Sequence, residues 1–144
     1  VIAGNAGVMV TEVLYHKPAP DRTFMIVDAG MNDLMRPALY QAHHDIVPVN
    51  QPAGDSHQVE YDIVGPICES TDKFAARRKM PAVEPGERIA FMSSGAYGAV
   101  LSSQYNARPL VAEVLVDGDQ FAVVRRRPSF EQMIELEQMP DWLT

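Results

Sequence analysis

Residues 112–125 read AEVLVDGDQFAVVR, and this stretch contains the clearest fold signal in the sequence. Two runs rich in β-branched residues flank the turn Asp117-Gly118-Asp119. Asp-Gly between two such runs is a strong β-hairpin signal, because glycine accepts the positive φ that a tight hairpin turn requires. The stretch therefore predicts two antiparallel strands, at 112–116 and 121–125.

Other segments of the chain share the same character. They are short, rich in β-branched or aromatic residues, and bounded by glycine or proline, at 8–15, 23–28, 45–49, 57–64 and 88–92. The first two should pair as a hairpin across turn residues 17–21, residues 50–55 should form a loop, and residues 83–87 should form a Pro-Gly turn. Strands at such short, even spacing predict a mostly β fold, an antiparallel β-barrel or sandwich.

Helices are expected to be few and short. Asn32 or Asp33 is a candidate cap for a helix that reaches Tyr40, with Pro37 in its first turn. A helical turn is expected at 73–78. Near the end of the chain, Ser129 is a candidate cap for a C-terminal helix. A stripe of apolar residues at helical spacing follows it and should pack in the core: Phe130, Met133, Ile134 and Leu136.

Length and charge exclude several classes of protein. The 144 residues suit one domain, and a net charge of −7 argues against nucleic acid or an anionic membrane as partner. No apolar run is long enough to span a bilayer, and no signal-peptide pattern is present, so we expect a cytoplasmic location. One cysteine among eight methionines fits a reducing compartment. Because the chain starts without methionine inside an apolar stretch, we expect it to be a fragment.

The most informative local motif is Gly65-Pro66-Ile67-Cys68-Glu69-Ser70, followed by Asp72. A lone cysteine is most often a small buried hydrophobic residue. Here a rigid Gly-Pro corner precedes it, and Glu69 and Asp72 bring charge beside the sulfur, which favours a reactive thiol on a loop at the end of strand 57–64. A second small-residue corner, 93–98, should expose Tyr97 and allow close approach of a ligand.

Motifs for other chemistries are weak. His43 and His44 are adjacent and should point apart, and His16 and His57 lie at no ligand spacing, so no metal site is expected. The sequence contains neither a glycine-rich phosphate loop nor a Gly-x-Ser-x-Gly elbow.

Five blocks of the sequence resemble segments of diaminopimelate decarboxylase, both in their residues and in their order along the chain. They cover nearly the whole chain and read VDAGMNDL at 27–34, RPALY at 36–40, GPICES at 65–70 with Asp72, GAYG at 95–98 and YNARP at 105–109. This family belongs to the fold type III pyridoxal-phosphate decarboxylases, dimers that join an N-terminal (β/α)8 barrel to a C-terminal Greek-key β-domain. The resemblance implies that residues 1–144 are that single C-terminal domain, and that the barrel is absent from this chain.

The resemblance also implies roles for individual residues. Cys68 resembles the family's proton donor, Glu69 its contact to the distal ammonium of the substrate, and Arg36 with Tyr40 the pair that binds the distal carboxylate. Tyr97 resembles the tyrosine that contacts both pyridoxal phosphate and substrate. The implied reaction is decarboxylation of meso-diaminopimelate to L-lysine, at a homodimer interface across which the cysteine loop is donated.

Two alternatives stay open. A related decarboxylase would act on lysine, ornithine or arginine, but Arg36 argues against it because only diaminopimelate has a distal carboxylate. A noncatalytic β-domain for dimerisation or protein binding would retain these residues without using them. None of the three lysines, Lys17, Lys73 and Lys79, lies in a motif for a Schiff-base lysine. The isolated chain is therefore expected to be inactive.

Overall fold

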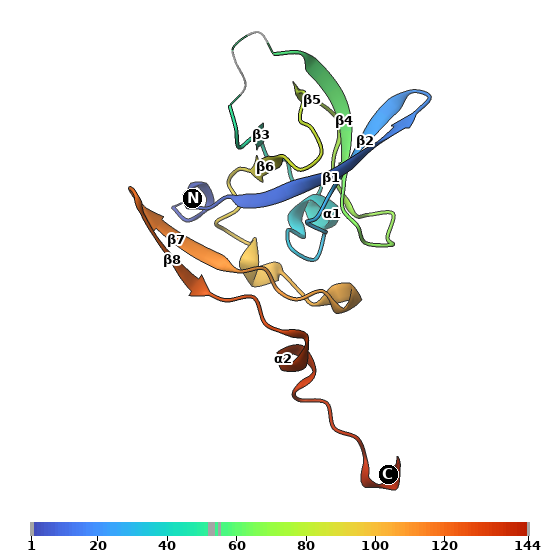
Figure 1. Cartoon of the computed structure of the whole chain (residues 1–144), viewed down its shortest axis with the longest axis vertical. Helices are drawn as coiled ribbons and strands as arrows, with labels where there is room; N and C mark the ends of the chain where they lie inside the picture. The colour runs from blue at the N-terminus through green and yellow to red at the C-terminus, as the bar shows by residue number, and fades with distance from the viewer. Residues whose placement is uncertain (1, 52–53, 55, 144) are drawn as a thin grey trace. The chain divides into compact units, whose positions relative to one another are not determined.

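The computed structural model describes residues 2–51, 54 and 56–143 (Figure 1). It divides into two compact units, Val1–Ser102 and Ser103–Thr144. The predicted loop at 50–55 falls partly outside the described residues, at 52, 53 and 55. The assignment of all 144 residues to one domain stays a prediction.

The first unit is built on one six-stranded sheet. Its strands are β1 (Met9–Ala19), β2 (Arg22–Val27), β3 (Ile46–Pro48), β4 (Gln58–Val64), β5 (Lys73–Pro81) and β6 (Arg88–Phe91). They lie in the order β3-β6-β1-β2-β4-β5, and edge strand β3 contacts edge strand β5. The sheet thus nearly closes on itself as a barrel, which confirms the predicted mostly β fold class. Its short helical elements are η1 (Gly4–Ala6), α1 (Arg36–Tyr40) and η2 (Ala99–Leu101).

The hairpin predicted near the start of the chain is confirmed. β1 and β2 pair antiparallel from Val13↔Val27 to Ala19↔Arg22. The strand runs further than expected, because Pro18 pairs with Thr23 instead of ending the strand, and the turn is confined to residues 20–21.

One strand pair departs from the antiparallel pattern. β2 and β4 pair in parallel, in the register Thr23↔Tyr61 to Ile26↔Val64. The other pairs of this sheet, β1–β2, β1–β6, β3–β6 and β4–β5, are antiparallel. Because β2 and β4 run in the same direction, the segments that follow them leave the sheet at the same edge.

Apolar side chains from all six strands fill the interior of the nearly closed barrel. The fully buried ones include Val13, Met25, Ile63, Ile89 and Phe91. The rings of Phe74 on β5 and Phe91 on β6 lie 4.6 Å apart between centroids, a typical aromatic packing distance. The predicted Pro-Gly turn at 83–87 leads into β6: Glu87 N–H donates to Glu84 O (3.0 Å), and Gly86 has φ +88°.

The helical turn expected at 73–78 is wrong, since these residues belong to β5. Phe74 and Met80 bury their side chains in the core. A backbone irregularity at Arg77, where φ is +48°, is stabilised because its N–H donates to the Asp62 carboxylate (2.7 Å). Pairing with β4 and burial of the apolar side chains outweigh the helical propensity of this lysine-, alanine- and arginine-rich segment.

The second unit contains the other predicted hairpin. β7 (Glu113–Asp117) and β8 (Gln120–Arg125) pair antiparallel, and Gly118 in the turn has φ +60°. The unit also contains η3 (Tyr105–Ala107), α2 (Phe130–Ile134) and η4 (Asp141–Leu143). Most apolar side chains of the hairpin are exposed, among them Val116 and Phe121.

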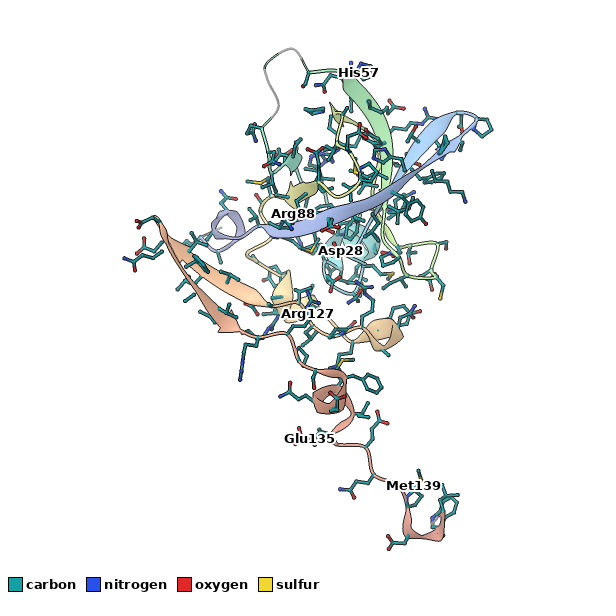
Figure 2. All side chains as sticks on the ribbon, viewed as in Figure 1. Asp28, His57, Arg88, Arg127, Glu135 and Met139 are labelled. Atoms are coloured by element: carbon teal, nitrogen blue, oxygen red, sulfur yellow. The ribbon has the colours of Figure 1, made fainter. Side chains whose placement is uncertain are left out.

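The start of the C-terminal helix is as predicted, but its packing is not. Ser129 caps α2, with Gln132 N–H donating to Ser129 Oγ (3.3 Å) and Ser129 N–H donating to Gln132 Oε1 (3.0 Å). The expected core packing of the apolar stripe is wrong, because Phe130, Ile134 and Leu136 are exposed. The helix ends at Ile134, before Leu136, and Figure 2 shows the side chains along the segment through Glu135 and Met139.

Candidate functional site

The parallel pairing of β2 with β4 determines where the two most informative loops begin. Residues 28–35 follow β2 and lead into α1, which starts at Arg36. Residues 65–72 follow β4 and carry Cys68 and Glu69. Since Ile26 is paired with Val64, both loops leave the same edge of the sheet, one residue or two beyond this pair.

A buried carboxylate links these two loops. Asp72 accepts the Met31 N–H at Oδ1 (2.7 Å) and the Ile67 N–H at Oδ2 (2.6 Å). Its side chain is buried, although Cys68 and Glu69 on the same loop are exposed. The sequence suggested Asp72 only as a source of charge near the sulfur. The structure assigns it a further function, which is to connect the loop after β4 to the loop after β2.

Two glycines allow the loops to approach so closely. A Cβ atom on Gly65 would lie 2.6 Å from Ala29 O and would also collide with the Asp72 carboxylate. A Cβ atom on Gly30 would lie 2.7 Å from Asn32 Oδ1 and 2.9 Å from Ile67 Cδ1. Real Cβ atoms do not come this close to other atoms, so the Ala29 carbonyl requires glycine at position 65, whereas at position 30 the side chains of Asn32 and Ile67 would have to shift.

A third segment, the corner at 93–98, borders the first loop. A Cβ atom on Gly98 would lie 3.9 Å from Leu34 Cδ1, which is ordinary van der Waals contact. Backbone hydrogen bonds from Ser94 N–H to Gly7 O (2.8 Å) and from Gly95 N–H to Gly4 O (3.1 Å) hold this corner in place. The loop after β2 therefore adjoins both the Cys68 loop and this corner in the first unit.

The predicted residues differ in exposure. Cys68 and Glu69 are exposed, Tyr40 and Tyr97 are each 64% exposed, and Arg36 is half-buried at the start of α1. The Arg36 guanidinium makes no hydrogen bond or ion pair with the described part of the chain, so it can bind an anion. Tyr40 follows Arg36 by four residues on α1 and thus lies on the same face of the helix.

The predicted residues do not line an open groove that this unit carries. An open groove of about 490 Å³ runs between α1 and β5, and it is lined by Pro37, Ala38, Gln41, Ala42, His43, Ser70, Thr71, Lys73, Phe74, Ala75, Ala76 and Arg78. The loop of Cys68 contributes Ser70 and Thr71 to one end of it. Arg36, Tyr40, Cys68, Glu69 and Tyr97 lie outside this lining.

The adjacent histidines point apart, as predicted. His43 is exposed and its Nε2 lies 3.2 Å from Asp45 Oδ1, whereas His44 is buried and its Nδ1 lies 2.9 Å from Met92 O. A carbonyl oxygen only accepts, so the His44 ring carries its proton on Nδ1. Among the described residues no group of three or more histidine, cysteine or acidic side chains is arranged to hold a metal ion. No helix in the described part of the chain is both long enough and apolar enough to cross a membrane.

Comparison with known proteins identifies relatives along nearly the whole chain. The family model described as "Pyridoxal-dependent decarboxylase, C-terminal sheet domain" matches residues 1–95. Diaminopimelate decarboxylase from Zymomonas mobilis is 46% identical over 142 residues, which is 99% of this chain and 33% of the relative. The chain thus spans about a third of the length of the curated relatives it matches.

Solved structures agree with these relatives in fold. Diaminopimelate decarboxylase from Helicobacter pylori complexed with L-lysine superposes with a TM-score of 0.86 at 42% identity, over 94% of this chain and 33% of that one. The enzyme from M. jannaschii in co-complex with L-lysine gives 0.91 at 33% identity, over 98% and 32%. The match at residues 1–95 includes β1 to β6 and both loops linked by Asp72. The chain therefore belongs to the pyridoxal-dependent decarboxylase family, and residues 1–95 are its C-terminal sheet domain.

Proposed function

We propose that this chain is the substrate-recognising and proton-donating part of a diaminopimelate decarboxylase, which converts meso-diaminopimelate to L-lysine. The observation that carries the proposal is the shared edge at which β2 and β4 end. There the loop before Arg36 and the exposed Cys68-Glu69 loop lie side by side, linked through Asp72. A cation for a carboxylate and a thiol beside an acid are what this substrate and this reaction require.

Substrate recognition falls to Arg36 and Tyr40 in this proposal. A planar guanidinium can donate to both oxygens of a carboxylate at once, and a phenol one helical turn away adds a third donor. The half-buried position of Arg36 at the start of α1 supports this role, since partial burial strengthens an ion pair with a ligand. Lysine, ornithine and arginine lack the distal carboxylate and would leave this guanidinium unpaired.

Proton delivery falls to Cys68, with Glu69 beside it. Replacing a carboxyl group on an amino acid by hydrogen requires an acid held at one face of the α-carbon. The exposed thiol meets this requirement because it can be reached from outside the domain. The adjacent carboxylate of Glu69 suits the positively charged distal ammonium of the substrate.

The residues of this chain fit pyridoxal phosphate as a contact surface and not as its anchor. The family is pyridoxal-dependent. When bound, the cofactor supplies an electron sink for the bond that breaks. Tyr97, largely exposed on its corner, would contact the cofactor and the substrate. Lys17, Lys73 and Lys79 are exposed strand residues, and Lys73 borders only the open groove beside α1, so the covalent anchor is assigned to an N-terminal (β/α)8 barrel.

Two chains are needed for a complete site in this proposal. The exposed Cys68 loop would reach the active site of a partner subunit in a homodimer. A cytoplasmic location is proposed with it, as expected for an enzyme of lysine biosynthesis.

The test uses the full-length protein with added pyridoxal phosphate. Carbon dioxide release should be detected from meso-diaminopimelate and should be far slower from lysine, ornithine or arginine. Cys68→Ala should lower kcat by about 100-fold or more, the usual contribution of a positioned acid. Lys79→Ala, an exposed residue of β5 outside this loop, is the control and should leave kcat unchanged. Absence of carbon dioxide release with fully loaded cofactor would favour a noncatalytic β-domain.

A further inference from the structure

Asp72 has hydrogen-bond partners in two different loops. Oδ1 accepts the Met31 N–H and Oδ2 accepts the Ile67 N–H, at 2.7 and 2.6 Å. Both bonds are short, and a carboxylate that accepts backbone amides in a buried position forms stronger hydrogen bonds than a neutral acceptor does. Met31 precedes Arg36 by five residues, and Ile67 immediately precedes Cys68.

The loop around Cys68 has its own internal hydrogen bonds. Glu69 N–H donates to Ile67 O (2.8 Å), Asp72 N–H donates to Glu69 O (3.0 Å), and Gly65 N–H donates to Asp72 O (3.1 Å). These bonds fix the shape of the loop without involving any carboxylate. The Asp72 side chain connects this preformed loop to the segment after β2 through the Met31 N–H, beside a longer contact from Thr71 Oγ1 to Met31 Sδ (3.5 Å). Its effect is therefore on the placement of the loop more than on its shape.

We propose that Asp72 is a positioning residue, whose buried carboxylate sets the location of Cys68 and Glu69 relative to the segment that carries Arg36. It acts through the Ile67 and Met31 amides and touches neither substrate nor cofactor. The kinetic consequence of this inference rests on the proposed function. The structural consequence does not, because it concerns only the exposure and reactivity of the Cys68 thiol.

Asp72→Asn is the informative substitution because it changes hydrogen bonding at nearly constant volume. An amide group has one accepting oxygen, so either the Met31 or the Ile67 N–H would face an NH2 group that cannot accept. A buried donor without an acceptor is costly, and the loop should move to relieve it. The backbone-to-backbone bonds within the loop would survive, so we expect a displaced loop in a folded protein.

Asp62→Asn is the matched control. Asp62 is also a buried aspartate that accepts a backbone N–H, from Arg77 at 2.7 Å, together with the Arg22 guanidinium at 3.2 Å. These partners lie at the start of β2 and on β5, outside the Cys68 loop. The control therefore reports what loss of any buried carboxylate does to the unit.

The experiment measures two properties of the full-length protein with cofactor. One is the rate at which iodoacetamide alkylates Cys68, followed by mass spectrometry of its peptide. The other is the pair kcat and KM for meso-diaminopimelate. In Asp72→Asn we expect the alkylation rate to change by about threefold or more, and kcat to fall by about 10- to 100-fold, as for a reacting group displaced by roughly an ångström. KM should rise as well, because Glu69 moves with Cys68.

Asp62→Asn should lower the melting temperature while its alkylation rate, kcat and KM stay within about twofold of the wild type, since sites without shared partners act independently. If both variants lose stability and neither changes Cys68 alkylation or kinetics, Asp72 is only structural and the proposal fails. If the enzyme releases no carbon dioxide at all, the proposed function fails, but the alkylation comparison still decides the role of Asp72.

A second variant perturbs the same carboxylate from the opposite side. Gly65→Ala would place a methyl group against Asp72 and Ala29 O. It should alter Cys68 alkylation in the same direction as Asp72→Asn, and the double variant should be little worse than either single one. Additive effects would overturn the proposal. Hydrogen exchange of the unmodified protein is decisive even if neither variant folds: slow exchange at the Met31 and Ile67 amides is expected, and fast exchange at both would refute the link.

Discussion

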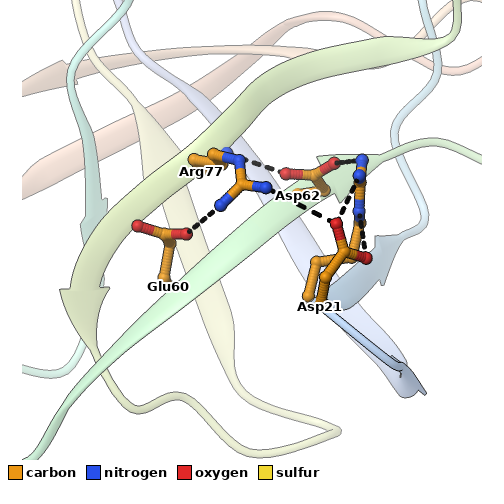
Figure 3. Close-up of polar contacts among 5 residues, drawn as sticks. Asp21, Glu60, Asp62 and Arg77 are labelled. Atoms are coloured by element: carbon orange, nitrogen blue, oxygen red, sulfur yellow. Dashed lines mark hydrogen bonds and ion pairs between the residues drawn. The ribbon is translucent and has the colours of Figure 1, made fainter.

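The Arg22 guanidinium at the start of β2 donates to the buried carboxylate of Asp62 on β4, at 3.2 Å from Nη1 to Oδ2 (Figure 3). Only 4% of the Asp62 side chain is exposed, against 37% of the Arg22 side chain. The same guanidinium binds Asp21, and Arg77 binds Glu60 and Asp21 nearer to solvent. A cluster of charges thus joins the β1–β2 turn to β4 and β5.

Replacing Arg22 by methionine should lower the free energy of unfolding by about 1–3 kcal/mol, because a buried carboxylate then loses a charged donor. Arg77→Met is the matched control and should cost less than about 1 kcal/mol, since its side-chain ion pairs are exposed and its backbone N–H still reaches Asp62. Urea unfolding of both variants measures the difference. Equal losses of unfolding free energy in the two variants would mean that the burial of Asp62 does not strengthen its ion pair with Arg22.

Asp21 should make stability depend on acidic pH. The hydrogen bond from Arg22 is the main cause that lowers the pKa of Asp21 below its ordinary value of 3.8, although burial opposes it. A carboxyl group with a lowered folded pKa adds stability above its unfolded pKa and loses it as pH falls through the folded value. Between pH 6 and pH 2.5, the urea midpoint of the wild type should therefore fall further than that of Asp21→Asn. Parallel curves would contradict this.

Replacing Gly86 by a residue with a side chain should destabilise the protein only because of the backbone conformation at this position. It has φ +88° in the turn before β6, yet a Cβ atom there would meet nothing within 4 Å. Gly86→Ala should cost about 1 kcal/mol, the usual penalty for an L-residue in this region. Gly4→Ala, also in open space but without positive φ, is the control. A lower melting temperature for Gly4→Ala than for Gly86→Ala would refute this account.

Arg36→Lys should separate substrate recognition from general charge. Lysine keeps the positive charge but cannot donate to both carboxylate oxygens in one plane, so KM for meso-diaminopimelate should rise by about 10-fold or more. Arg88→Lys, an exposed arginine at the start of β6, should leave KM unchanged. Steady-state kinetics of the full-length protein provide the measurement. An unchanged KM in Arg36→Lys would remove Arg36 from the site.

Local patterns predicted the strands and turns well where the signal lies in neighbouring residues. The Asp117-Gly118 turn, the Ser129 cap and the Pro-Gly turn before β6 each depend on a few adjacent side chains. The exposed setting of Cys68 after β4 was predictable for the same reason.

What sequence reasoning missed depends on distant partners. Residues 73–78 have helical propensity, and only pairing with β4 makes them a strand. The link from Asp72 to Met31 spans 41 positions, and the only local hint was the pair of glycines at 30 and 65. The stripe at Phe130 and Leu136 has the spacing of a buried face, but spacing does not say whether a covering surface exists.

The parallel pairing of β2 and β4 also makes the geometry of the proposed site depend on the packing of the core. A one-residue slip of β4 along β2 would turn Ile63 from the core toward solvent and would move Gly65 by about 3.3 Å along the sheet. Such a slip would lower the stability of the fold through lost apolar burial, whether or not a ligand is bound. Selection for a well-packed interior would thus also preserve the distance between the Cys68 loop and helix α1, which starts at Arg36.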